Sequence, residues 1–144
     1  MRALILGIAV AAALSSPVFA QEGLVHELQE RYAAAQGAFL REEFLRVVSL
    51  VKPVADDASG KLAVALSIPP EADHAIQLWL WYALSLERLQ RPADALRAID
   101  GLKTALAALP ADPGIQRGVE SLWPEVLFWE GEISRRAQKL GRAK

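Results

Sequence analysis

The sequence predicts an all-α protein built from antiparallel helical hairpins, and three observations lead there. The 144-residue chain is rich in Ala, Leu, Glu and Arg, which are good helix formers. Apolar residues recur at intervals of three and four, as they do along one face of a helix, whereas strand-like alternation is almost absent. Prolines stand near the expected ends of several of these segments, where they start or stop helices.

The first twenty residues have the three parts of a secretory signal peptide. One arginine follows the initiating methionine, residues 3–14 are apolar and uncharged, and Val18 and Ala20 are small residues at the positions that a signal peptidase requires. The apolar stretch is shorter than the ~20 residues that span a bilayer. We therefore expect cleavage after Ala20 and a periplasmic or secreted mature chain, residues 21–144, that does not insert into a membrane.

The composition of the mature chain suits one domain held together by packing. Arg2 leaves with the signal peptide, so 15 basic and 17 acidic residues remain, a net charge of −2. This balance gives no general attraction towards nucleic acid or anionic lipid. The chain has no cysteine, which excludes disulfides and a lipid-modified cysteine.

Two helices are expected in the first part of the domain. Residues 22–40 carry one apolar stripe, and residues 43–52 carry a second, which Pro53 should end because it lacks a backbone donor. The inward residues are Leu24, Leu28, Tyr32, Ala35 and Phe39 in the first helix and Phe44, Val47, Val48 and Val51 in the second. Residues 55–70 show no clear period and are expected to be irregular.

The helix expected over residues 71–89 is apolar over most of its circumference, which predicts that other helices surround it. Its two apolar faces comprise Ala75, Leu78, Trp79, Tyr82, Leu86 and Leu89, and Ile76, Leu80 and Leu84. The next helix should run from Pro92 to residue 109, before Pro110.

The C-terminal part predicts a short helix over residues 113–120, capped by Asp112, and a last helix over residues 121–140. Ser121 is the expected cap of the last helix and Gly141 its expected stop. Its acidic residues precede its basic ones, which complements the helix dipole. The basic residues Arg135, Arg136, Lys139, Arg142 and Lys144 end the chain, and weak contact with an acidic partner is the alternative role for them.

Residues 76–109 resemble one tetratricopeptide repeat, a helical hairpin of about 34 residues. The family's large and small positions fall on Trp79, Tyr82, Ala83, Leu86, Ala95 and Ile99. The first two helices resemble a poorer copy, with Phe44 and Val47 at two of these positions and residues 55–70 as an insertion. The resemblance implies a right-handed stack of hairpins that binds a partner on its concave face, and an irregular helical bundle is the alternative.

The resemblance implies that one face of the helix over residues 71–89 binds a peptide or a partner helix. The candidate contacts are Gln77, Leu80, Trp81, Leu84 and Arg88. A tryptophan near an arginine is typical of an interface anchor. The alternative is that Trp81 is a core residue, packed on the C-terminal helix against Trp123 or Trp129.

The sequence shows no motif for catalysis, for a cofactor or for a metal. His26 and His74 are the only histidines, and the chain offers no cysteine as a further zinc ligand. His26 and Glu30 are spaced as a solvated helix pair, and Asp56 and Asp57 are typical of a turn. We expect no enzyme, no cofactor and no metal site.

Together these features predict an exported, tetratricopeptide-repeat-like protein–protein interaction module of the cell envelope. It would be non-catalytic and would bind a protein or peptide on its concave face, with no nucleic-acid partner. The alternative is a small structural or self-associating helical bundle without a ligand groove. The identity of the partner and the oligomeric state stay open.

Overall fold

The computed structural model describes residues 17–55 and 60–143. These residues form six α-helices and no strand, which confirms the all-α prediction. In chain order the helices are α2 (Pro17–Leu40), α3 (Phe44–Ala55), α4 (Lys61–Leu66), α5 (Pro69–Arg88), α6 (Pro92–Ala107) and α7 (Pro113–Ala143). None of the described helices combines the length and the apolar character that a bilayer crossing requires.

The predicted signal peptide falls mostly outside the described residues, which begin at residue 17. α2 starts at Pro17 and continues through Ala20, the expected cleavage position, without interruption. Cleavage and export therefore stay predictions.

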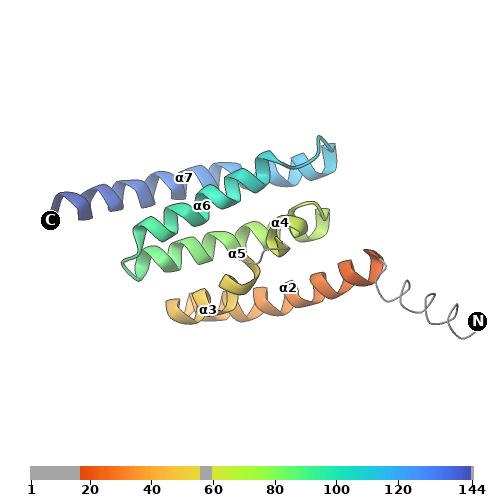
Figure 1. Cartoon of the computed structure of the whole chain (residues 1–144), viewed down its shortest axis with the longest axis horizontal. Helices are drawn as coiled ribbons and strands as arrows, with labels where there is room; N and C mark the ends of the chain where they lie inside the picture. Colours follow the sequence, from red (N-terminus) through yellow and green to blue (C-terminus); the bar gives the residue numbers. More distant parts are fainter. Residues whose placement is uncertain (1–16, 56–59, 144) are drawn as a thin grey trace, which may run out of the picture.

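The helices form three layers, in which consecutive long helices run antiparallel (Figure 1). α2 and α3 form one outer layer, α4 and α5 the middle layer, and α6 and α7 the other outer layer. α5 packs against each of the other five helices of the described chain. This position confirms the expectation that the most apolar helix is surrounded by others.

The turns of the two hairpins, α2–α3 and α5–α6, have the same backbone conformation. Glu42 (φ 59°) and Gln90 (φ 63°) are both left-handed, although neither is glycine. In the first turn the amide of Glu43 donates to the carbonyl of Ala38, and in the second the amide of Arg91 donates to the carbonyl of Leu86. Both turns therefore end the preceding helix with the same six-to-one hydrogen bond, typical of a Schellman cap.

The structure corrects two of the expected boundaries in the first part of the chain. Pro53 does not end the second helix, because α3 continues to Ala55. Pro53 lacks the N–H that would donate to the carbonyl of Ser49 one turn earlier. Both residues are exposed, so water can reach that carbonyl. Residues 61–66, expected to be irregular, form α4, whose Leu62, Ala65 and Leu66 are buried in the core.

The C-terminal part contains one helix where two were expected. Asp112 caps α7 as predicted, since its Oδ1 accepts the amides of Gly114 at 2.8 Å and Ile115 at 3.1 Å. Ser121 does not start a second helix, because its hydroxyl donates to the carbonyl of Gly118 within the same helix. The helix also continues past Gly141, the expected stop.

Candidate functional site: a cationic pocket between α3 and α6

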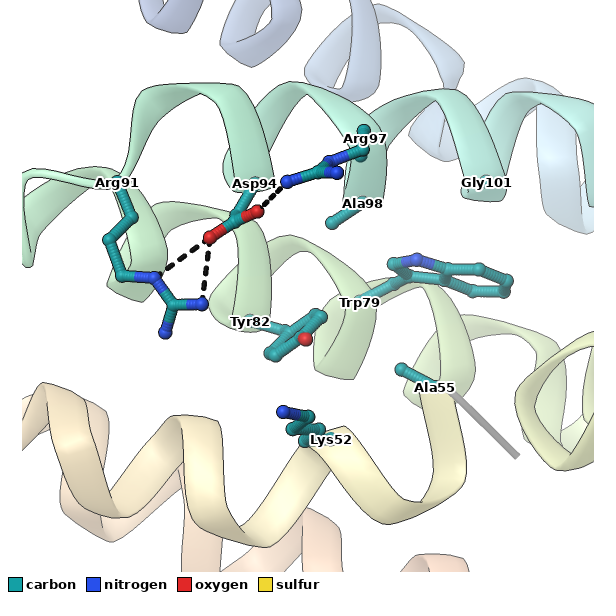
Figure 2. Close-up of a pocket in the computed structure, with 9 residues that line it drawn as sticks. All are labelled: Lys52, Ala55, Trp79, Tyr82, Arg91, Asp94, Arg97, Ala98 and Gly101. Atoms are coloured by element: carbon teal, nitrogen blue, oxygen red, sulfur yellow. Dashed lines mark hydrogen bonds and ion pairs between the residues drawn. The ribbon is translucent and has the colours of Figure 1, made fainter.

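A pocket of about 350 Å³ opens between α3 and α6, above the middle helix α5 (Figure 2). α3 forms one wall, α6 and its N-cap form the other, and two aromatic side chains of α5 lie between them. The lining residues are Lys52, Ala55, Trp79, Tyr82, Arg91, Asp94, Arg97, Ala98 and Gly101.

The floor of the pocket is aromatic and largely buried. Trp79 and Tyr82 are each only 7% exposed, so one edge of each ring faces the pocket while the rest packs in the core. Gly101 of α6 contributes to the space above the tryptophan: a Cβ atom there would lie 3.4 Å from Cζ2 of Trp79. A larger side chain at position 101 would therefore fill this end of the pocket.

A charge cluster forms the α6 wall. Arg91 donates to Oδ2 of Asp94 through Nε at 2.8 Å and pairs with the same oxygen through Nη2 at 2.7 Å. Arg97 donates to the other oxygen, Oδ1. The hydrogen bond from Arg91, with that from Arg97, lowers the pKa of Asp94 from its ordinary value, so its carboxylate stays ionised.

This arrangement leaves the wall cationic and supplied with free donors. One carboxylate holds two guanidinium groups, so the Arg91–Asp94–Arg97 cluster has a net charge of +1. Each guanidinium has five N–H donors, of which Asp94 takes only some. The side chains of Arg91 and Arg97 are 50% and 76% exposed, so the remaining donors are available to a ligand.

Lys52 adds a second positive charge from the opposite wall. Its ammonium group lies across Tyr82 from the α6 cluster (Figure 2). Lys52 makes no hydrogen bond or ion pair with any part of the chain that the structure describes. The described lining residues thus carry a net charge of +2 over an aromatic floor.

These groups can bind an anion, and carboxylates fit them well. Arginine presents paired donors to a carboxylate, and lysine adds a point charge. Trp79 and Tyr82 offer apolar surface to the carbon stem that carries the charge. The lining residues that the structure describes include no serine, cysteine or histidine, so the usual pairing of a nucleophile with a base is absent among them.

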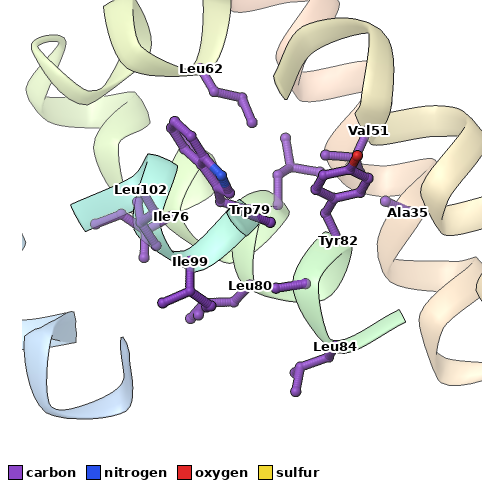
Figure 3. Close-up of a cluster of buried hydrophobic side chains, with 14 of the residues drawn as sticks. Ala35, Val51, Leu62, Ile76, Trp79, Leu80, Tyr82, Leu84, Ile99 and Leu102 are labelled. Carbon is purple, nitrogen blue, oxygen red and sulfur yellow. The ribbon is translucent and has the colours of Figure 1, made fainter. Parts of the chain in front are cut away.

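The structure divides the five residues that were expected to bind a partner, and two of them, Leu80 and Leu84, belong to the buried apolar cluster (Figure 3). Leu80 is 1% exposed and Leu84 is 8% exposed, so their placement on an open face is wrong. The helical repeat explains why. Leu80 and Leu84 fall on the same side of α5 as Gln77 and Glu87, which bond to residues of α7, and α7 therefore covers that side.

Gln77, Trp81 and Arg88 keep some access to solvent. Gln77 is partly buried, and its amide donates to Oε2 of Glu125 on α7 at 3.3 Å. The side chain of Arg88 is 55% exposed. None of these three residues is among the described lining residues of the pocket between α3 and α6.

Trp81 packs on α2 and not on the C-terminal helix. Its ring centroid lies 5.1 Å from that of Tyr32 and 6.0 Å from that of Phe39, and it stacks on the phenylalanine at 23°. The alternative prediction that Trp81 packs against Trp123 or Trp129 therefore names the wrong neighbours. Trp81 does contribute to the core, as that alternative expected.

No constellation in the described part of the chain has the ligands for a metal ion. Nε2 of His26 lies 3.1 Å from Oε1 of Glu30, and both side chains are largely exposed, which fits a solvated helix pair. His74 lies against the ring of Tyr32 and within 3.2 Å of the buried carboxylate of Glu71.

The pocket was not predicted, although the sequence contains part of the pattern that forms it. Arg91, Asp94 and Arg97 are spaced three apart at the start of a helix, so their mutual contact follows from helix geometry. Lys52 is 39 positions before Arg91, and only the packing of α3 and α6 around α5 brings them to one pocket.

Comparison with known proteins finds no family model, no curated protein and no solved structure that matches this chain.

Proposed function

We propose that this protein is an exported, non-catalytic interaction module of the cell envelope that binds an acidic peptide segment of a partner protein. The cationic pocket is the observation that carries the proposal. Lys52, Arg91 and Arg97 present positive charge around a hollow of about 350 Å³, and among the described lining residues only the carboxylate of Asp94 offsets them.

The pocket suits a side chain that ends in a carboxylate. A glutamate or aspartate of the partner would reach between Lys52 and the arginines with its carboxylate, while its carbon stem lies on the aromatic floor. The rim residues are long and exposed, so the flanking residues of the peptide run along the groove between α3 and α6. Complementary charge of this kind raises the association rate and selects acidic partners.

A tetratricopeptide-repeat-like stack is part of this proposal. The order of the helices, the antiparallel hairpins and the matching turns at Glu42 and Gln90 support it. The face with Gln77, Trp81 and Arg88 is the alternative place for the peptide, since it carries one exposed cation, Arg88.

A binding experiment with matched charge reversals tests the proposal. The probe is a fluorescein-labelled peptide of consecutive glutamates, followed by anisotropy at low salt. Lys52→Glu should weaken binding about tenfold or more, because it turns an attraction into a repulsion inside the pocket. Lys139→Glu makes the same change on an exposed position of α7 and should leave binding within about twofold.

A second pair of variants separates the two faces. Arg97→Glu should weaken binding as Lys52→Glu does, whereas Arg88→Glu should not. Equal losses in the pocket variants and in Lys139→Glu would mean that only overall charge matters, and would refute the pocket. A loss confined to Arg88→Glu would move the site to the face between α2 and α7.

A further inference from the structure

The outer side of α7 is apolar at its centre and is not covered by any other described helix. Leu127 is 44% exposed and Phe128 is 59% exposed, whereas Val126 and Ile133 on the opposite side are fully buried. α7 packs against α5 and α6 through that buried side. Large apolar side chains this exposed at adjacent positions suggest a contact surface.

The exposed residues of α7 are arranged symmetrically about the point between Leu127 and Phe128. The exposed side continues in both directions through Pro124 and Glu120 towards the start of the helix and through Gly131 and Arg135 towards its end. Glu120 and Arg135 are equally far from the centre, and so are Pro124 and Gly131. An acidic residue thus mirrors a basic one, and a proline mirrors a glycine.

We propose that a second copy of this chain docks here, with the two α7 helices antiparallel and a two-fold axis between Leu127 and Phe128. In this register Leu127 meets Phe128 of the second copy, and Glu120 meets its Arg135. Each contact occurs twice, as in any isologous dimer. The proposal does not depend on the pocket, which lies between α3 and α6.

Charge selects this register and this direction. Glu120 makes no hydrogen bond or ion pair within the part of the chain that the structure describes. Arg135 already pairs with Glu132 in its own helix at 2.9 Å, and its side chain is 49% exposed. An antiparallel pair gives Glu120 a cation from the second copy, whereas a parallel pair in register would place Glu120 against Glu120 and Arg135 against Arg135.

Shape agrees with charge at the centre. A Cβ atom built on Gly131 has no neighbour within 4 Å, so this position is an open gap on the outer surface. Phe128 of the second copy would lie opposite Leu127, between Pro124 and Gly131. The missing side chain at position 131 lets the phenylalanine ring lie close to the helix backbone.

Sedimentation equilibrium of the purified protein over a range of concentrations tests the proposal. We expect a monomer–dimer equilibrium, and Leu127→Glu should weaken it about tenfold or more because it places two carboxylates in an apolar contact. Leu45→Glu is the matched control, since Leu45 of α3 is 73% exposed and lies outside the proposed contact. A wild-type protein that stays monomeric throughout, or equal effects of the two variants, would overturn the proposal.

Introduced cysteines test the register, because the chain has none of its own. Positions 127 of the two copies lie within about one residue rise along the axis, whereas positions 120 are about 22 Å apart. Oxidation should therefore link Leu127→Cys into dimers and leave Glu120→Cys unlinked. Linkage of both variants would indicate a parallel pair, and linkage of Glu120→Cys alone or of neither would indicate another surface, so that each of these outcomes contradicts the proposed contact.

Discussion

Replacing Gln90 by glycine should stabilise the protein, because this residue holds a left-handed backbone conformation that suits glycine. Gln90 has φ 63° at the turn between α5 and α6. A residue with a Cβ atom pays about 1–2 kcal/mol for this conformation. Glycine avoids that cost, although its greater freedom in the unfolded chain takes back roughly 0.5–1 kcal/mol. The expected net gain in the free energy of unfolding is about 0.5–1 kcal/mol.

The same substitution at a helical position provides the control. Gln36 is exposed in the interior of α2, and Gln36→Gly should cost about 0.5–1 kcal/mol. Urea unfolding followed by circular dichroism measures both variants. Opposite signs for Gln90→Gly and Gln36→Gly are expected, and Glu42→Gly, at φ 59°, should behave like Gln90→Gly. A loss of stability in Gln90→Gly would refute the assigned conformation of the turn.

Three further substitutions test the packing and the charges of the core. Ser85→Ala should leave stability unchanged or raise it by up to about 1 kcal/mol in urea unfolding, because the buried hydroxyl has no hydrogen-bond partner among the described residues; a loss above 1 kcal/mol would reveal one. Trp81→Ala should cost about 2–3 kcal/mol through lost contacts with the rings of α2, below the usual range for a fully buried aromatic; a loss under 0.5 kcal/mol would mean that the ring does not pack there. For Glu27, desolvation opposes ionisation, but hydrogen bonds from Lys61 and Arg31 outweigh it and lower its pKa below the ordinary 4.5. The contribution of the Glu27 carboxylate to stability is therefore complete above pH 4.5 and is lost as the pH falls through the lowered pKa. The difference in unfolding midpoint between wild type and Glu27→Gln should close on acidification. A difference that stays constant would contradict the pairing.

The sequence predicts the helices well wherever periodicity and end signals agree. The stripe from Leu24 to Phe39 predicted the end of α2 at Leu40, and Pro92 predicted the start of α6. Asp112 caps α7 because a short acidic side chain reaches the first free amides of a helix. These features depend on neighbouring residues alone.

The errors arose where a local rule competes with packing. Pro53 removes one hydrogen bond, but burial of Val54 beyond it keeps the last turn of α3 helical. The segment 61–66 is too short to show a helical period. It forms a helix because Leu62 and Leu66 are buried against the rest of the protein. Pro124 and Ser121 together resembled a helix start, yet both lie inside α7.

The candidate sites were harder to predict for a related reason. Burial of Leu80 and Leu84 depends on α7, whose contacts are not visible in the sequence of α5. The pocket joins Lys52 to Arg91 and Arg97 across two hairpins, so only its α6 wall could be foreseen.

The most direct test of the proposed binding site follows the indole N–H signals of the protein by NMR while an acidic peptide is added. Trp79 lies in the floor of the pocket, whereas Trp81 lies on the face towards α2. The proposal predicts that the Trp79 indole signal shifts with peptide concentration and that the Trp81 signal does not, and that Lys52→Glu removes the shift. A shift of Trp81 alone, or peptide binding that leaves Trp79 unchanged, would contradict it.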